Sequence, residues 1–178
     1  MVASDDSSIS ERLIKIELDD NAGLRRSAEA EQERAIAIYD ILEDNKFGVP
    51  HQSGPFHLYL GMDGRHVHFD IRNVYDNEIS QFFMAMGPMR RIIRDYFHVC
   101  DTYYDAIRTK SPSQIQAIDM GRRALHNEGS ELLQTRLDGK VITDNRDPMQ
   151  FSRRTGFCLA QRWKGLGSVG LISRRLTG

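Results

Sequence analysis

The sequence predicts an α+β protein with a mainly antiparallel sheet of about four strands and with helices packed on one face of the sheet. Two short alternating segments, residues 56–61 and 66–71, flank Asp63-Gly64, a strong signal for a β-hairpin turn. Apolar residues at spacings of three and four across residues 89–107 predict a long amphipathic helix. Because the predicted strands follow one another through short turns, antiparallel pairing is favoured.

The composition is that of an ordinary soluble globular protein. The chain has 178 residues, of which 40% are hydrophobic and 28% charged, and these values exclude disorder throughout, a collagen-like chain and a small disulfide scaffold. Cys100 and Cys158 lie far apart and have no partner at metal-ligand spacing. A disulfide framework and a cysteine zinc site are therefore not indicated, and a reducing cytoplasm is the expected setting.

We expect a single domain over residues 11–164, with a disordered acidic N-terminus at residues 1–10 and a flexible basic tail at residues 165–178. The first ten residues are polar and acidic without an apolar centre, which does not fit a signal peptide. No run of about 18 apolar residues occurs in the chain, so no membrane span and no membrane partner are expected.

The first two elements are predicted to be a strand and a helix. Residues 12–19 alternate, with Ile14, Ile16 and Leu18 on the side expected to be buried. Ser27 is a candidate N-cap, and glutamates follow it where the positive end of a helix dipole favours them. The predicted helix runs to about Asp44. Its expected apolar stripe is Ala35, Ile38, Ile41 and Leu42.

The hairpin allows a register to be predicted. If Asp63-Gly64 forms the centre of a two-residue turn, every pair across the two strands follows from it. The expected core-side pairs are Leu60 with Val67, Leu58 with Phe69, and Phe56 with Ile71, and the expected outer pairs are Gly61 with His66, Tyr59 with His68, and His57 with Asp70. A turn at residues 73–77 leads to a third strand at residues 78–86.

Helices are predicted for most of the remaining chain. Gly87-Pro88 starts the long amphipathic helix, since proline is favoured at the first helical position. A second helix is expected from about Ser113 to Asp138-Gly139, where glycine provides a stop. A short apolar segment follows at residues 141–143. Residues 148–164 form a possible amphipathic helix that contains the single tryptophan, Trp163.

The net charge of −1 conceals an uneven distribution. Residues 1–144 contain 17 Lys and Arg and 24 Asp and Glu, a net charge of −7. Residues 145–178 contain seven basic residues and one acidic residue, a net charge of +6. A basic end on an acidic body can bind phosphates, fold back on the body or simply remain solvated.

Three stretches of sequence carry a resemblance to a known family. They are Ile36-Ala37-Ile38-Tyr39-Asp40, the segment from Arg94-Asp95-Tyr96-Phe97 through Tyr103-Tyr104-Asp105-Ala106-Ile107-Arg108, and Ile118-Asp119-Met120-Gly121-Arg122-Arg123-Ala124-Leu125-His126-Asn127-Glu128-Gly129-Ser130. On these residues the chain resembles the bacterial uncharacterised protein family 0262 over roughly residues 11–144. The resemblance implies no reaction, cofactor or catalytic residue. Similar members end near a Trp-basic-Gly sequence, here Trp163-Lys164-Gly165, which thirteen residues follow.

The outer face of the hairpin is a first candidate site. In the predicted register His57, His66, His68 and Asp70 converge, and two imidazoles with a carboxylate are ligands that zinc or iron(II) accepts. The alternative is a solvent-exposed sheet face in which a cross-strand His–Asp pair adds under about 1 kcal/mol.

The helix that carries residues 120–130 is a second candidate site. Arg122 and Gly129 fall within the apolar sector defined by residues 115, 118, 125 and 132. A buried arginine needs a carboxylate or a phosphate. The functional interpretation is an anion-binding or proton-transfer site in which Arg122 and Arg123 bind the anion, His126 is the acid or base and Glu128 orients it. The structural alternative is a buried salt bridge and a close helix crossing at Gly129.

A third candidate is the group Arg90, Arg91 and Arg94 at the start of the long helix. Cations oppose the helix dipole there, which hints at an external anion such as a nucleic-acid phosphate or an acidic protein. The alternative is ordinary ion pairing within the helix, because Arg91 and Asp95 are four residues apart.

The preferred functional interpretation is a cytoplasmic, non-catalytic binding module for a protein or RNA partner. The alternative is a small hydrolase or transferase acting on a phosphorylated or carboxylated substrate around Arg122, His126 and Glu128. A structural subunit of a larger assembly, including a homo-oligomer, is a third possibility. Gly-rich phosphate loops and the common hydrolase motifs do not occur in the sequence, and no cofactor is expected.

Overall fold

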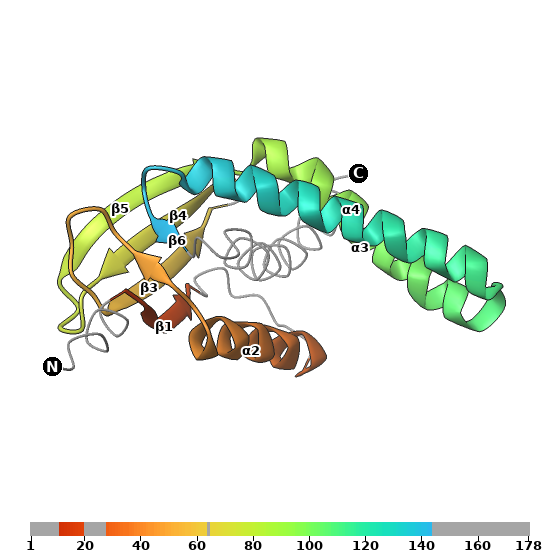
Figure 1. Cartoon of the computed structure of the whole chain (residues 1–178), viewed down its shortest axis with the longest axis horizontal. Helices are drawn as coiled ribbons and strands as arrows, with labels where there is room; N and C mark the ends of the chain where they lie inside the picture. The colour runs from red at the N-terminus through yellow and green to blue at the C-terminus, as the bar shows by residue number, and fades with distance from the viewer. Residues whose placement is uncertain (1–10, 20–27, 64, 144–178) are drawn as a thin grey trace, which may run out of the picture.

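The computed structural model describes residues 11–19, 28–63 and 65–143, and the helices and strands within them follow the predicted order (Figure 1). The elements are β1 (Leu13–Leu18), α2 (Ala28–Glu43), β2 (Phe47–Gly48), β3 (Phe56–Met62), β4 (His66–Arg72), β5 (Glu78–Ala85), α3 (Gly87–Thr109), α4 (Pro112–Leu137) and β6 (Ile142–Thr143). The α+β class is confirmed. The expected helix at residues 148–164 and both expected tails lie outside the described residues.

The main sheet has four strands in the order β1-β3-β4-β5. Its β3–β4 and β4–β5 pairs are antiparallel, whereas β1 runs parallel to β3. A parallel pair needs a long crossover connection, and the segment between these strands supplies one that contains α2. The short strands β2 and β6 form a separate antiparallel pair.

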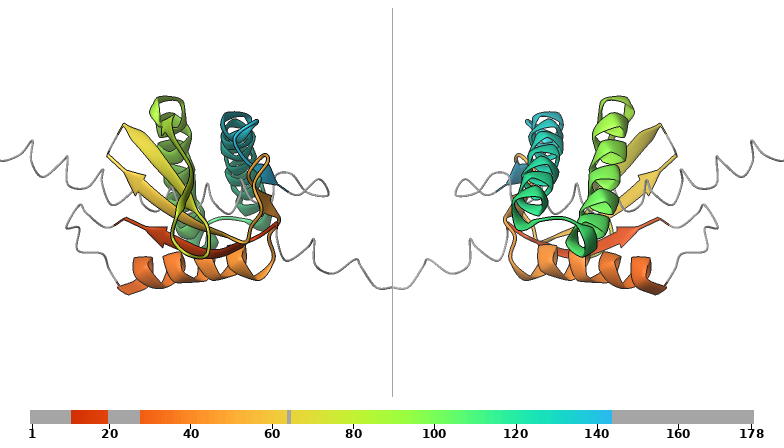
Figure 2. Two further views of the ribbon diagram at one scale, coloured as in Figure 1. Left: turned by 90° about the vertical axis from the view of Figure 1, so that its left-hand side faces the viewer. Right: turned by 90° about the vertical axis from the view of Figure 1, so that its right-hand side faces the viewer.

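The helices pack on one face of the main sheet, as predicted. Figure 2 shows α3 and α4 side by side and α2 running across the sheet beside β1. In the buried core, the inner side chains of β3, β4 and β5 pack against apolar side chains from each of the three helices. Its largest fully buried members are Phe47, Phe56, Phe69, Leu13, Ile41, Leu58, Ile71, Met86, Leu133 and Val67.

The hairpin register differs from the predicted one by two residues. Leu58 lies opposite Ile71, Leu60 opposite Phe69 and Met62 opposite Val67. The cause is the turn: the backbone N–H of Asp63 donates to the His66 carbonyl at 3.2 Å, so Asp63 precedes the turn instead of occupying its centre. A shift of two matches the period of a strand, so the predicted core and solvent faces are unchanged.

The Asp63 side chain holds this turn. Its Oδ1 accepts the backbone N–H groups of Arg65 at 2.8 Å and His66 at 2.7 Å. These two bonds also lower the pKa of the Asp63 carboxyl. An aspartate that bonds the backbone two and three residues ahead is a common turn device, and it competes with the Asp-Gly turn that the sequence favoured.

The predicted burial of β1 is wrong at one residue. Leu13 and Ile16 are buried, but Ile14 is 44% exposed. The register with β3 shifts between Leu13 and Lys15, so an irregularity there interrupts the alternation. The Asn45 side chain binds both backbone groups of Leu13: its Oδ1 accepts the Leu13 N–H at 2.7 Å, and its Nδ2 donates to the Leu13 carbonyl at 3.1 Å.

The buried stripe of α2 differs from the predicted stripe by part of a helical turn. Ala37 and Ile41 are buried against the sheet, with Ile38 and Leu42 partly buried beside them. Ala35, which was expected in the stripe, is exposed. The small side chain of Ala37 suits the close approach of α2 to β1.

The helices α3 and α4 form a long antiparallel pair that extends past the end of the sheet (Figure 1). Near the sheet, Met89, Ile92 and Ile93 on α3 are buried, whereas Tyr104 and Ile107, which continue the same stripe, are 63% and 52% exposed. The amphipathic pattern therefore runs further than the sheet that covers it. Beyond the sheet, α3 and α4 pack mainly on each other.

At Gly129, α4 lies close against Ile92 of α3. A Cβ built on Gly129 would lie 3.3 Å from Cγ2 of Ile92. The two helices are therefore close here, as predicted, because any larger side chain at residue 129 would have to displace Ile92 by a few tenths of an ångström.

We predict that Gly129→Leu lowers the free energy of unfolding by about 1–3 kcal/mol through overpacking against Ile92. The matched control is Gly121→Leu on the same helix, where a Cβ meets nothing within 4 Å. The control gains stability of about 1 kcal/mol because leucine has the higher helix propensity. Urea unfolding followed by circular dichroism measures both changes. Equal stabilisation of the two variants would contradict the close crossing.

Candidate functional site

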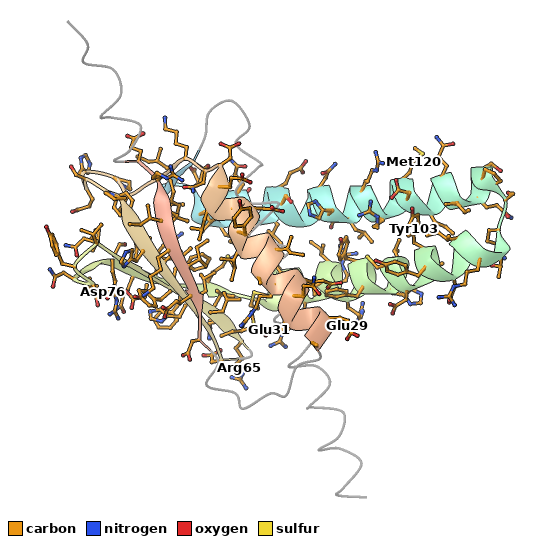
Figure 3. The ribbon with its side chains drawn as sticks, turned by 90° about the horizontal axis from the view of Figure 1, so that it is seen from below. Glu29, Glu31, Arg65, Asp76, Tyr103 and Met120 are labelled. Atoms are coloured by element: carbon orange, nitrogen blue, oxygen red, sulfur yellow. The ribbon has the colours of Figure 1, made fainter. Side chains whose placement is uncertain are left out.

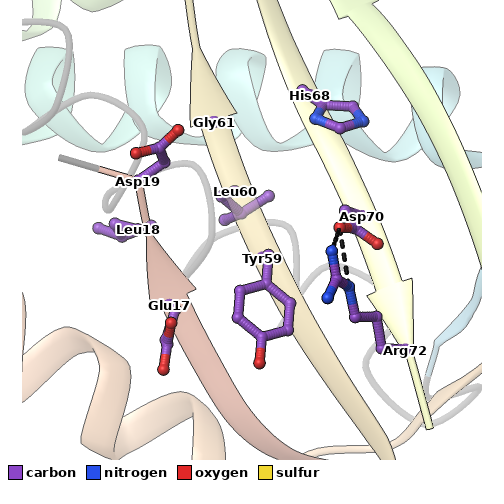
Figure 4. Close-up of a pocket in the computed structure, with 9 residues that line it drawn as sticks. All are labelled: Glu17, Leu18, Asp19, Tyr59, Leu60, Gly61, His68, Asp70 and Arg72. Atoms are coloured by element: carbon purple, nitrogen blue, oxygen red, sulfur yellow. Dashed lines mark hydrogen bonds and ion pairs between the residues drawn. The ribbon is translucent and has the colours of Figure 1, made fainter. Parts of the chain in front are cut away.

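The outer face of the main sheet contains a pocket of about 290 Å³. Figure 4 shows it across β1, β3 and β4, on the side of the sheet opposite the helices. The residues that line it are Glu17, Leu18, Asp19, Tyr59, Leu60, Gly61, His68, Asp70 and Arg72. Most of them are polar, so this is the face that the alternating pattern of the strands directs to solvent.

The space between Asp19 and His68 at one end of the pocket is open because residue 61 is a glycine (Figure 4). A Cβ at Gly61 would stand 3.7 Å from Cβ of His68 and 3.9 Å from Oδ2 of Asp19. Both distances are ordinary contacts, so a larger side chain fits the backbone but fills the pocket. Glycine inside a strand weakens the strand and commonly marks a place where another group approaches closely.

Asp70 and Arg72 form the most buried charged pair of the site. Asp70 is 6% exposed, and its Oδ2 accepts two bonds from Arg72, from Nε at 2.9 Å and from Nη2 at 2.6 Å. The hydrogen bond to Asp70 raises the pKa of Arg72. The other oxygen, Oδ1, is buried with no hydrogen-bond partner among the described residues. An acceptor left in this state costs about 1–3 kcal/mol.

Tyr59 is the centre of a second polar network beside the pocket. Its hydroxyl accepts a hydrogen bond from Lys15 Nζ at 2.9 Å and donates to Asp76 Oδ1 at 2.9 Å. His57 Nδ1 lies 2.9 Å from the same Asp76 oxygen, and Lys15 also pairs with Glu17 at 2.8 Å. These bonds fix the phenol in one orientation.

The same contacts shift two pKa values. The pKa of Asp76 is lowered, first by its hydrogen bond with His57 and then by that with Tyr59. The pKa of Lys15 is raised, first by its hydrogen bond to Glu17 and then by that to Tyr59. Lys15 and the Arg72 guanidinium lie 5.0 and 4.9 Å from the centre of the Tyr59 ring, a cation–π arrangement that also stabilises the charged forms.

His68 borders the pocket on β4. Its ring stacks on Phe83 at 4.5 Å between centroids, and its Nε2 lies 3.3 Å from Oε1 of Gln81. Phe83 is nevertheless 64% exposed. The side of the pocket on β4 therefore includes an imidazole that is fixed by a stacked aromatic ring and by a side-chain amide.

The metal candidate of the hairpin face is not formed. His57 lies opposite Arg72, and Asp70 lies opposite Tyr59, so the predicted His57–Asp70 pair is wrong. His57 is bound by Asp76, and Asp70 is bound by Arg72. Within the described ranges there is no group of three His, Cys, Asp or Glu side chains that could hold a metal ion.

In the second candidate site, on the helix that carries residues 120–130, the charged side chains mainly form ion pairs with one another or with α3. Arg122 donates to Asp119 Oδ1 from Nε at 3.0 Å and from Nη2 at 2.7 Å, and Arg123 Nε binds the other Asp119 oxygen at 2.8 Å. The predicted carboxylate partner of Arg122 is confirmed. Its predicted burial is wrong, because the side chain is 31% exposed. The reason is position: Arg122 lies where α3 and α4 have left the sheet.

The other members of this candidate do not assemble as expected. Glu128 accepts a bond from Arg91 Nη2 of α3 at 2.9 Å. The His126 ring packs near the ring of Tyr96 at 5.9 Å. Ser130 donates to the His126 carbonyl at 2.8 Å. Burial, the largest cause, raises the pKa of Tyr96, and Cys100 raises it further, whereas Arg122 acts in the opposite direction.

The arginines at the start of α3 also have partners within the protein. Arg91 binds Glu128 and lies 3.8 Å from Asp95, while Arg94 Nε donates to Asp95 at 3.2 Å. Arg90 also interacts with another group of the protein. Local carboxylates thus compensate the charges of Arg91 and Arg94, two of the three arginines that suggested an external anion.

Sequence reasoning missed the pocket itself. Glu17, Asp19 and Arg72 were not singled out, because the parallel pairing of β1 with β3 is a long-range contact that no local pattern reports. The one available signal was Gly61 within an alternating strand.

The comparisons with known proteins give a consistent result. A family model described as an uncharacterised protein family (UPF0262) matches residues 10–159. The UPF0262 protein of Rhodospirillum rubrum is 47% identical over 135 residues, which are 76% of this chain and 84% of that protein. The UPF0262 proteins of Methylobacterium radiotolerans and Azorhizobium caulinodans are 47% and 48% identical, cover 86% of this chain, and are themselves covered to 94% and 95%. No solved structure matches.

No helix in the described part of the chain has the length and apolar character needed to cross a membrane.

We predict that Asp76→Asn flattens the acid dependence of stability. A carboxyl whose pKa is lowered in the folded state contributes stability above its unfolded pKa, about 3.9, and loses it as the pH falls through the folded pKa. Asparagine tolerates the positive φ of 60° at this residue, so the turn is retained. Thermal melts should show the difference between wild type and variant shrinking as the pH falls below about 4.

The control for this measurement is Glu131→Gln, which removes an exposed carboxylate on α4. Its melting temperature should follow that of the wild type across the same pH range. A difference between wild type and Asp76→Asn that stays constant with pH would show that the contacts of Asp76 do not depend on its charge.

Proposed function

The chain belongs to the uncharacterised protein family UPF0262, and we propose that it is a non-catalytic binding module for a protein partner. The observation that carries this proposal is the pocket on the open sheet face. Three carboxylates line it, from Glu17, Asp19 and Asp70, and two cations lie beside them, Arg72 on Asp70 and Lys15 on Glu17, so one negative charge is left in excess. The partner that fits this chemistry presents a lysine or arginine side chain.

The shape and the lining of the pocket support a cationic group. A volume of about 290 Å³ accommodates the end of one long side chain and its water. The carboxylate oxygens accept hydrogen bonds, and the rings of Tyr59 and His68 offer aromatic faces on either side of Gly61. Asp70 Oδ1, which lacks a donor among the described residues, gains a hydrogen bond if a small rearrangement admits an ammonium or guanidinium.

A protein partner is favoured over RNA by the charge of the body. Residues 1–144 carry a net charge of −7, which repels phosphates, and Arg91 and Arg94 at the start of α3 are engaged by carboxylates. A basic protein surface is attracted by the same charge. Steering of this kind raises the association rate and weakens with salt.

Binding is favoured over catalysis by the state of the helix residues. An anionic substrate at Arg122 would compete with Asp119, which holds both Arg122 and Arg123. Glu128, the expected partner of His126, is held by Arg91. A hydrolase or transferase would need these pairs to separate first.

We also propose a cytoplasmic location. The chain has two cysteines, and Cys100, a partly exposed residue within the apolar stripe of α3, forms no disulfide among the described residues. A structural role as a small apolar residue in a reducing compartment accounts for it.

The proposal predicts selective binding of basic peptides. Heteronuclear NMR titration uses three blocked tripeptides, Gly-Arg-Gly, Gly-Lys-Gly and Gly-Glu-Gly. We expect shifts at the amides of Tyr59, Gly61 and His68 with the first two and none with the third, because the lining carries an excess of carboxylates. The affinity should fall as salt is added.

Two variants make the titration specific. Gly61→Leu fills the pocket without a backbone clash and should abolish the shifts. Gly121→Leu adds the same side chain in open space on α4 and should leave them unchanged. Binding of the basic peptides that survives in Gly61→Leu, or tighter binding of a single-stranded RNA than of either peptide, would overturn the proposed partner class.

A further inference from the structure

The structure points to the free edge of β5, and we propose that this edge pairs with β5 of a second copy of the chain to form a dimer with a continuous sheet. This inference is independent of the pocket and its partner. β5 is the terminal strand of the order β1-β3-β4-β5, so within the described residues its outer side lacks a neighbouring strand. Alternate backbone N–H and carbonyl groups along its eight residues face that side.

The two edges of the sheet are treated differently. At the β1 edge, Asn45 bonds both backbone groups of Leu13, and the strand carries charged side chains at Lys15 and Glu17. Charges and a covering residue are common means of preventing edge-to-edge pairing. The β1 edge is therefore protected against a second strand.

The β5 edge has almost none of this protection. Its sequence, EISQFFMA, contains no proline and no lysine, and its only charge is Glu78 at the first residue. Its register shift with β4 lies at that same end, beside Arg72 and Glu78, so residues 80–85 form an uninterrupted ladder. A long edge strand without charges or proline along its length is a surface that pairs with another strand.

The side chains of β5 suit a copy of themselves. In an antiparallel pair, residues directly opposite each other share a face, so odd-numbered residues pair with odd-numbered ones. Phe83, which is 64% exposed, would then lie opposite Ile79 or Gln81 of the second copy. On the inner face, Phe82 and Met84 of the two copies would extend one apolar layer.

The charges at the two ends of β5 favour a second copy of the chain as the partner of this edge. Asp76 and Glu78 lie at the start of β5. Arg65 lies at its other end, where its carbonyl accepts the N–H of Met86 at 2.8 Å. Figure 3 shows Arg65 and Asp76 at different ends of the sheet. An antiparallel pair of two copies sets the acidic end of each beside the Arg65 end of the other, so both ends attract.

Sedimentation-velocity analysis of the full chain tests the dimer. We expect a concentration-dependent monomer–dimer equilibrium in the wild type. Phe83→Lys should raise the dissociation constant at least about tenfold, because it introduces two like charges at the paired edges. The matched control is Tyr104→Lys, which replaces an equally exposed aromatic residue on α3, away from the edge. It should leave the equilibrium unchanged.

A charge exchange keeps the test independent of Phe83 and of its contact with His68. Arg65→Glu and Glu78→Arg should each weaken the dimer, and the double variant should restore it, since the opposite charges then face each other again across the two copies. Thermal melts verify that each variant is folded. A wild type that stays monomeric at the concentration of an NMR sample overturns the proposal, as does a dimer that Phe83→Lys leaves intact.

Discussion

The parallel pairing of β1 with β3 is the contact on which the rest of the structure depends. It joins residues more than forty positions apart, such as Ile16 and Leu58, and it requires the chain between them to cross the sheet. That crossing contains α2, which supplies Ala37 and Ile41 to the core. The same pairing sets Lys15 beside Tyr59 and Glu17 beside the pocket. Both the inner core and the outer site therefore rely on one ladder.

The local elements could be predicted from the sequence, and the long-range ones could not. The period of α3, the proline at its start and the hairpin faces are properties of neighbouring residues, so they follow from spacing alone. The register of the hairpin depended on whether Asp63 stands in the turn or before it, a choice that its side-chain bonds to residues 65 and 66 decide. A strand that forms a parallel pair across a crossover leaves no comparable local trace.

The candidate sites show the same division. The pairing of Arg91 with Asp95 on α3 was correctly expected, because residues four apart are neighbours on a helix. The burial of Arg122 could not be predicted, since the sequence gives the apolar stripe of a helix but not the length of sheet that covers it. Glu17, Tyr59 and Asp70 form a site only because three strands, β1, β3 and β4, bring them together.

The pair α3–α4 has a consequence for how the molecule opens. Its outer part has no sheet beneath it: Tyr104 and Ile107 are exposed, and the last buried residues toward the turn are few. Cooperative stability comes from tertiary packing more than from helix propensity. Backbone amides should therefore exchange with solvent along a gradient, fastest near Ser111 and slowest near Gly129 and Ile92. The protein would then combine a slowly opening body with a helical arm that unfolds and refolds without it.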